Sequence, residues 1–184
     1  DFVGAVFAAN EDKMYFDGVD DYVSFSAGSI PLGSQERAFV FQMSLPTITS
    51  DEIELFGYGQ DIDGRRFDVG FAGSLDAEGS TGFILRHKGG FVSYEVPINE
   101  NQLYTVKVKV PLSASRCDDV EVYVDGTQIT PTSSSVLLNT GSSNFKIGSY
   151  EIVGGSDTTM QGLIYDFKVY DDYSESSLVH EWQG

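Results

Sequence analysis

The residues best suited to ligand recognition lie in the middle of the chain. They combine aromatic rings, which can cover the apolar face of a sugar, with forked donors and carboxylate acceptors that suit hydroxyl groups. They are Tyr58, Asp61, Arg65, Arg66, Arg86, His87 and Tyr94. The paired Arg65 and Arg66 could bind the carboxylate of an acidic sugar through two parallel hydrogen bonds. Alternatively, this arginine pair neutralises Asp61, Asp63 and Asp68, and the sequence leaves both interpretations open.

Three clusters of aspartates offer the carboxylate oxygens that a hard cation prefers. They are Asp17, Asp20 and Asp21; Asp61, Asp63 and Asp68; and Asp171 and Asp172. The second cluster has acids at alternate positions before Gly64, as a calcium loop does, but it lacks the distal glutamate of a helix–loop–helix site. Aspartates also gather in the solvated turns of any acidic chain, so calcium binding and plain turns are both open interpretations.

Histidine, cysteine and nucleotide chemistry have little support in the sequence. His87 and His180 are far apart and lack the spacing of metal ligands. Cys117 has only Arg116 as a basic neighbour, and as the single cysteine it allows no intrachain disulfide. The chain contains no nucleophile elbow, phosphate-binding loop or dinucleotide fingerprint. We therefore expect neither nucleophilic catalysis nor a nucleotide cofactor.

The charge of the chain limits its partners. Its 184 residues include 11 Lys and Arg against 28 Asp and Glu, a formal net charge of −17 at pH 7. Such a surface repels phosphate backbones and anionic lipids but suits divalent cations and neutral or basic ligands. Solubility in a salty medium is an alternative reason for the same charge. Because of this charge we expect no nucleic acid binding. No apolar run approaches the roughly 20 residues needed to cross a bilayer, so we also expect no membrane insertion.

Short β-strands are the elements expected to position these residues. Residues 104–110 and 120–124 alternate between apolar and polar side chains, which predicts strands with one buried face. The valines expected to share one core are Val106, Val108, Val110, Val122 and Val124. Gly89-Gly90 and Asp125-Gly126 predict two-residue hairpin turns. Only 174–182 has helical spacing, so we expect one short helical turn near the C-terminus.

Four motifs follow one another in an order found in a known family. They are the acidic stretch 14–25, Tyr-Val-Asp-Gly at 123–126, Phe-Lys-Ile-Gly at 145–148 and a closing strand at 162–170. Together they resemble laminin-G-like, concanavalin-A-like jelly rolls, from about Met14 to Trp182. The resemblance implies an all-β, antiparallel two-sheet jelly-roll sandwich in a single domain, 1–184. Because the sequence opens on an aspartate without an initiator methionine, we expect a domain excised from a larger protein.

The resemblance also implies a metal site. In this family the first acidic turn often helps to hold calcium, which points to Asp17 and Asp20 with Asp166 as a partner from the closing strand. Calcium is therefore the candidate cofactor. The chain departs from the family at Tyr165, where many relatives have an acidic residue, and Asp166 comes one place later on the opposite face of the strand.

Enzymes related to this family, the laminarinase-like glucan hydrolases, place their catalytic carboxylates along one strand facing a cleft. The nearest match here is Glu52 and Glu54, which share a face because strand side chains alternate. A retaining mechanism needs two carboxyl groups about 5–5.5 Å apart. The enzymes carry a further carboxylate in series, whereas the next positions on this face are Phe56 and Tyr58. We therefore interpret the two glutamates as a solvated strand edge and expect no catalysis.

These observations predict a non-catalytic carbohydrate-binding or adhesion domain. Its expected partners are a glycan or polysaccharide and other domains of a larger parent protein. We expect it outside the cell, on a cell surface or on a virion. One alternative is a structural protein–protein module built on the same sandwich. Another is a glycan-cleaving enzyme that uses Glu52 and Glu54.

Overall fold

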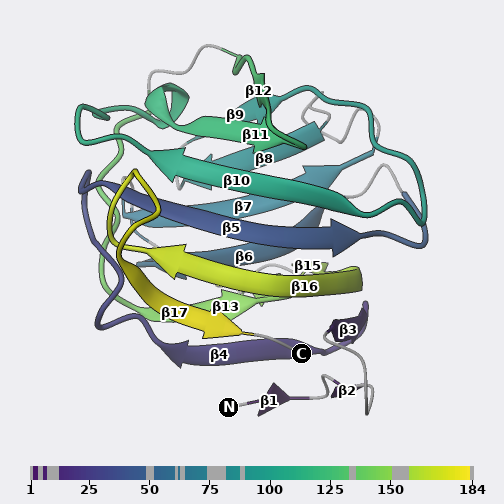
Figure 1. Cartoon of the computed structure of the whole chain (residues 1–184). Coiled ribbons are helices and arrows are strands. Elements are labelled where there is room, and N and C mark those ends of the chain that lie inside the picture. Colours follow the sequence, from purple (N-terminus) through teal and green to yellow (C-terminus); the bar gives the residue numbers. More distant parts are fainter. Residues whose placement is uncertain are drawn as a thin grey trace.

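Two antiparallel β-sheets packed face to face make up the fold (Figure 1). The computed structural model describes residues 2–3, 6–7, 13–48, 52–60, 62, 65–73, 82–87, 90–132, 136–150 and 158–182. Within these residues the one helical element is a 3-10 turn at Cys117–Asp119, and no helix is long and apolar enough to span a membrane. The prediction of an all-β sandwich is confirmed.

The seven-stranded sheet has the strand order β1-β4-β13-β6-β7-β8-β9. Its strands are β1 (Phe2–Val3), β4 (Tyr22–Ser26), β13 (Asn144–Ile147), β6 (Ile53–Gly59), β7 (Arg66–Ala72), β8 (Gly82–His87) and β9 (Gly90–Tyr94). A separate pair, β14 (Ser149–Tyr150) and β15 (Thr158–Thr159), follows β13 in the chain.

The eight-stranded sheet has the order β12-β11-β10-β5-β16-β3-β2, with β17 also paired to β16. Its strands are β12 (Thr127–Ile129), β11 (Glu121–Val124), β10 (Tyr104–Val110), β5 (Arg37–Ser44), β16 (Gln161–Tyr170), β3 (Met14–Asp17), β2 (Val6–Phe7) and β17 (Leu178–Trp182). Strands β3 and β17 follow one another along the same edge of β16, since β3 pairs with its first residues and β17 with its last.

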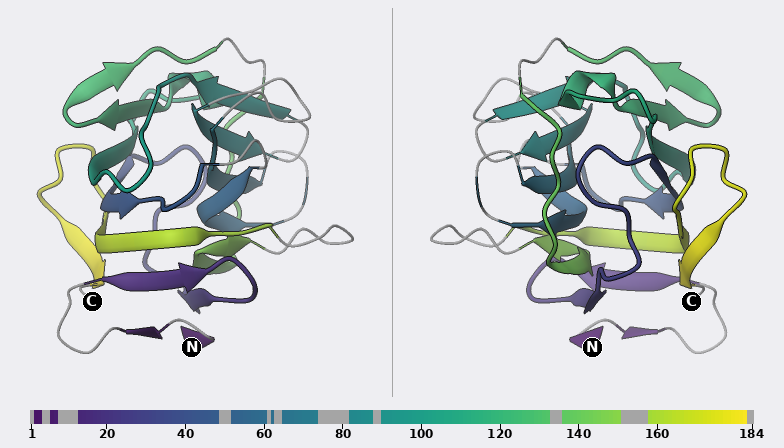
Figure 2. Two further views of the ribbon diagram at one scale, coloured as in Figure 1. Left: turned by 90° about the vertical axis from the view of Figure 1, so that its right-hand side faces the viewer. Right: turned by 90° about the vertical axis from the view of Figure 1, so that its left-hand side faces the viewer.

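Figure 2 shows the two layers of strands from either end. An aromatic core fills the space between these layers. The ring centroids of Phe39 in β5 and Phe56 in β6 are 4.8 Å apart, and those of Phe41 in β5 and Phe167 in β16 are 5.3 Å apart. The five valines predicted to share this core are all buried in it: Val106, Val108, Val110, Val122 and Val124. The alternation read from the sequence is therefore confirmed for β10 and β11.

The two predicted hairpins differ in outcome. Asp125 and Gly126 join β11 to β12 with φ angles of 48° and 80°, and two positive values define a type I′ turn. This hairpin is confirmed. At the other, His87 pairs with Gly90, so Gly90 belongs to strand β9 rather than to the turn. Positions 88 and 89 lie outside the described residues.

The predicted C-terminal helical turn is wrong, because Leu178–Trp182 forms strand β17. Tertiary contacts decide this segment: the Trp182 ring stacks on Phe25 at 4.2 Å and lies 6.0 Å from Phe167. Two apolar residues four apart fit a helix face as well as a strand face, so spacing over so short a segment does not separate the two.

Candidate functional site

A row of six residues crosses the outer face of the seven-stranded sheet, one on each strand from β4 to β9. Each is the cross-strand partner of the next. In order they are Ser24, Lys146, Gly57, Asp68, Arg86 and Phe91. Their neighbours along each strand, such as Val23, Ile147 and Phe56, belong to the core. Since strand side chains alternate, the row faces away from the core.

Near each end of the row a cation lies over an aromatic ring: Lys146 over Tyr22, which comes two residues before Ser24 on β4, and Arg86 over Phe91. Lys146 Nζ lies 4.8 Å from the centroid of Tyr22, and the guanidinium carbon of Arg86 lies 5.8 Å from that of Phe91. Both distances fall within the roughly 6 Å over which a cation is attracted to a ring face. All four side chains are half-buried. Lys146 and Arg86 are three strand spacings apart, about 14 Å, with Gly57 and Asp68 at the two positions between them.

Two residues of the row, Asp68 and Arg86, belong to a largely buried network of charged side chains. Arg86 Nε donates to Glu52 Oε1 at 2.8 Å and to Oε2 at 2.7 Å. Arg66 forms an ion pair with Asp68, and its NH2 lies 3.6 Å from Glu54 Oε1. The network needs a glycine on β7, because a Cβ at Gly70 would lie 2.5 Å from Glu52 Oε1. The missing side chain at Gly70 therefore leaves room for the Glu52 carboxylate beside β7, an interior strand of the sheet.

The network contains one more carboxylate than guanidinium. Glu54 is only 1% exposed, and burial raises its pKa to about 7 against the opposing attraction of the Arg66 guanidinium. Glu54 Oε2 and Asp68 Oδ1 are buried and have no hydrogen-bond partner in the described part of the structure. A proton on Glu54 balances the charges of the five groups, because Asp68 then neutralises Arg66 and Glu52 neutralises Arg86.

The interpretation of Glu52 and Glu54 as a solvated strand edge is wrong. Strand β6 lies in the interior of its sheet, and both glutamates are held by arginines. A β-bulge follows, since Glu54 pairs with Gly70 but Phe56 pairs with Val69. Phe56 therefore faces the core and does not share the face of the glutamates as predicted.

Two residues predicted to present aromatic faces to a ligand are instead part of the core. Tyr58 and Tyr94 are fully buried. The Tyr58 hydroxyl donates to the Pro31 carbonyl at 2.9 Å, and the Tyr94 hydroxyl donates to the Val120 carbonyl at 2.7 Å. The prediction is wrong for both rings, because strand alternation turns each one inward and a polar partner satisfies its hydroxyl.

The predicted arginines are separated by the fold. Arg66 is buried in its ion pairs, so neutralisation of acids describes it better than a role as an exposed sugar donor. Arg65 is exposed at the start of β7 and donates to Gln60 Oε1 at 3.2 Å. Of the seven predicted residues, Arg86 alone lies in the row. Asp61 and the side chain of His87 lie outside the described residues.

Tyr22, Lys146 and Phe91 lie on the same face as Arg86, although no pattern in the sequence groups these four residues. Tyr22 belongs to the acidic stretch near the start of the chain, and Lys146 to the Phe-Lys-Ile-Gly motif. Alternation along each strand could have placed each side chain on the outer face. Their grouping depends on the strand order, which a single sequence does not reveal.

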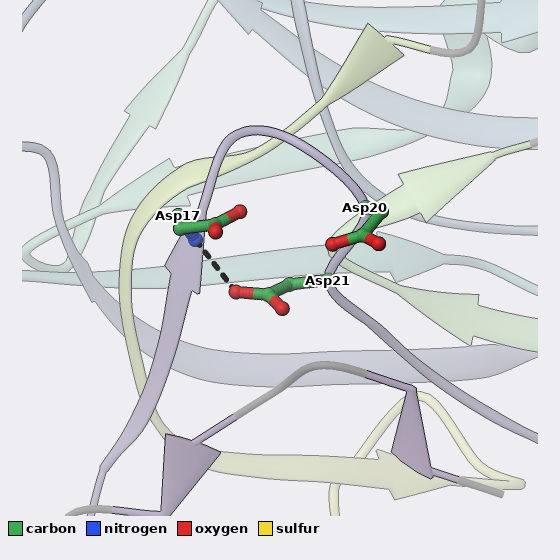
Figure 3. A group of neighbouring side chains, drawn as sticks. All are labelled: Asp17, Asp20 and Asp21. Atoms are coloured by element: carbon green, nitrogen blue, oxygen red, sulfur yellow. Dashed lines mark hydrogen bonds between the residues drawn. The ribbon is translucent and has the colours of Figure 1, made fainter.

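The first acidic turn forms a second candidate site (Figure 3). One oxygen from each of Asp17, Asp20 and Asp21 lies within 4.8 Å of the others. Asp21 Oδ2 accepts a hydrogen bond from the Asp17 backbone N–H at 2.8 Å, and Asp17 Oδ1 accepts one from Val19 at 2.8 Å. Two oxygens that share a calcium ion at 2.3–2.6 Å lie at most about 5 Å apart. The three carboxylates therefore fit a calcium ion.

The structure does not bring Asp166 to this turn. Asp17 pairs with Gln161, five residues earlier on β16, which is a separation of roughly 16 Å along the strand. Asp166 instead forms an ion pair with Lys168 at 2.8 Å. Asp17 and Asp20 keep their predicted place in a candidate metal site, and Asp21 takes the position expected for Asp166.

Neither a protein-family model nor a curated protein matches the chain. Its structure is similar to a heptameric SAP-like pentraxin from Limulus polyphemus (14% identity, TM-score 0.60, 91% of this chain and 79% of the other). It is similar to domain 4 of AbnA, a GH43 extracellular arabinanase from Geobacillus stearothermophilus (13%, TM-score 0.61, 92% and 74%). A third is the mouse laminin alpha1 chain, domains LG4-5 (11%, TM-score 0.58, 95% and 46%). These similarities show the fold of the chain, which is a concanavalin-A-like jelly-roll sandwich.

Proposed function

We propose that the chain is a non-catalytic carbohydrate-binding or adhesion domain of a larger protein outside the cell, on a cell surface or on a virion. The observation that carries the proposal is the row on the seven-stranded sheet, with a half-buried aromatic ring and a cation near each end. Rings and forked donors are the groups that sugars require. The arabinanase domain of similar fold was solved in complex with arabinotriose, which supports the same class of ligand.

The charges on this face favour a neutral glycan over an acidic one. With a proton on Glu54, Asp68 neutralises Arg66 and Glu52 neutralises Arg86, so the two arginines add no net charge that would attract an acidic sugar. Arg86 already donates to both carboxylate oxygens of Glu52, which leaves little of its charge for a sugar carboxylate. We therefore infer recognition of hydroxyl groups, with each ring covering the apolar face of a sugar near one end of the row.

Burial of the two glutamates supports binding rather than hydrolysis. A glycosidase needs two carboxyl groups that both reach the scissile bond. Here the Glu54 side chain is 1% exposed and faces Arg66, while the Glu52 side chain is 8% exposed and is held by Arg86. An acid and a nucleophile fixed in this way have no free approach to a substrate.

We also propose that the acidic turn binds calcium. Asp17, Asp20 and Asp21 would supply carboxylate ligands, and the ion would join β3 to β4. The turn is already ordered by its own hydrogen bonds and by Thr159 Oγ1, which donates to the Gly18 carbonyl at 2.5 Å. Calcium would add stability to this end of the sandwich.

A glycan array probed with and without calcium tests the binding proposal. We expect binding to neutral glycans, and Tyr22→Ala and Phe91→Ala should each weaken it about fivefold, because a lost ring contact removes roughly 1 kcal/mol. Tyr15→Ala is the matched control, since Tyr15 is an exposed tyrosine on the other sheet. Binding that survives both Tyr22→Ala and Phe91→Ala would contradict the assignment of this face as the glycan site.

Two further outcomes separate the alternative functions. Reducing sugar released by the wild type but not by Glu54→Gln would make the protein an enzyme. An array that stays blank at high protein concentration, with and without calcium, would favour a structural protein–protein module.

A further inference from the structure

An open groove of about 520 Å³ lies at one end of the sandwich, away from the row. This is the end at which β5 begins and β10 and β16 finish, on the left in Figure 1 and facing the viewer on the right of Figure 2. The loop between β4 and β5 forms one wall, and Leu112 and Asp171 complete the lining. The loop residues in the lining are Gly28, Ser29, Ile30, Pro31, Leu32, Gln35 and Glu36.

Buried polar groups hold this loop from beneath. Arg37 is fully buried and donates to the Gln35 carbonyl at 2.7 Å and to Thr140 Oγ1 at 2.8 Å. Gly33 and Thr140 exchange backbone hydrogen bonds at 2.7 and 3.3 Å, and the Tyr58 hydroxyl bonds the Pro31 carbonyl. A loop with this many internal anchors keeps one shape, so a ligand does not have to order it.

The groove combines acidic and apolar groups. Glu36 and Asp171 contribute carboxylates, and no lysine or arginine is among the described residues that line it. Pro31 and Leu32 form an apolar wall, and Leu112 at the rim is 75% exposed. A long basic side chain matches this arrangement, because its aliphatic stem can lie along apolar surface while its charged head reaches carboxylates.

We propose that this groove binds a lysine or arginine side chain within a basic segment of a partner protein. The net charge of −17 attracts such a segment from a distance, and the groove supplies the place where one basic side chain docks. This site is separate from the glycan-binding row, and the proposal does not depend on it.

Peptide binding measured by fluorescence anisotropy tests this inference. The probes are a labelled hexalysine peptide and a hexaserine peptide of the same length. The double variant Glu36→Gln/Asp171→Asn should bind hexalysine at least tenfold more weakly than the wild type. The control Glu100→Gln/Asp118→Asn also removes two negative charges, but from residues outside the groove. It corrects for non-specific attraction and should change binding less than twofold.

A third variant tests the apolar part without changing charge. Leu112→Ser should weaken hexalysine binding about threefold, and since Leu112 is exposed the variant should melt as the wild type does. Equal losses in the two double variants would overturn the proposal, because attraction would then be non-specific. Hydrogen exchange of loop 28–36 gives a second readout: slowing by hexalysine supports the site, whereas slowing by a neutral oligosaccharide and not by hexalysine overturns it.

Discussion

Replacing Glu54 by glutamine should remove a pH dependence of stability that runs opposite to ordinary acid denaturation. Glu54 is buried beside Arg66, and Arg66 is already neutralised by Asp68. Its carboxyl group is therefore more stable in the protonated form, with a pKa raised to about 7 from 4.5 in the unfolded chain. Glutamine has nearly the same shape as the protonated side chain and never ionises.

The sign and size follow from linkage. Between pH 4.5 and 7 the folded state holds a proton that the unfolded state has lost, so the free energy of unfolding falls as pH rises and levels off above pH 7. A shift from 4.5 to about 7 corresponds to about 3 kcal/mol in total, at 1.36 kcal/mol per pKa unit. Most of this, about 2–3 kcal/mol, is lost between pH 5 and pH 8. For a domain of this size that equals a fall in Tm of roughly 5–10 °C.

Thermal and urea unfolding at pH 5 and pH 8 would measure this difference. Glu54→Gln should match the wild type closely at pH 5 and exceed its stability at pH 8. Glu100→Gln, at an exposed position, is the matched control and should follow the wild type at both values. If Glu54→Gln were equally destabilised at both pH values, Glu54 would be an ionised partner that Arg66 requires, and the reasoning would be refuted.

Two other predictions concern the core and the acidic turn. Val108→Ala should lower the free energy of unfolding by about 1–3 kcal/mol in urea titrations, because Val108 is fully buried between the sheets; an unchanged midpoint would contradict the β10 register. Calcium should raise the Tm of the wild type and chelator should lower it, by mass action on the folded state. Asp17→Asn should abolish this response, whereas a wild type that melts equally with calcium and with chelator would leave the aspartates as turn residues.

Local patterns predicted the strands and both hairpins, although the second turn is shifted by one residue, because these features depend on neighbouring residues. Alternation over 104–110 places valines on one face, and Asp125-Gly126 accepts the positive φ angles of a type I′ turn. The bulge at Leu55 has no such local signal, and it changed which face of β6 the residues after Glu54 occupy. The strand that contains Trp182 likewise has no local signal, because it is stabilised by the contact of Trp182 with Phe25, a residue far from it in the sequence.

The candidate site was harder to predict than the fold, because it is assembled across strands. Arg86 was identified as a donor, but Tyr22 and Lys146 come from β4 and β13, each about 60 residues away from it in the sequence. Tyr58 and Tyr94 have the right chemistry for sugar stacking and the wrong face. Residue type narrows the candidates, whereas strand order decides which of them meet.

The position of β16 has a consequence for how the chain folds during synthesis. This strand pairs with β5 on one side and with β3 and β17 on the other. Its partners in β5 and β3 lie about 120 to 150 residues earlier in the sequence. A nascent chain that ends before residue 161 leaves one edge of β5 open and keeps β3 away from the rest of its sheet. Pairings between such distant segments form slowly, and an open strand edge invites association with other chains. The eight-stranded sheet should therefore close only after β16 leaves the ribosome, and until then the exposed β5 edge needs protection from aggregation.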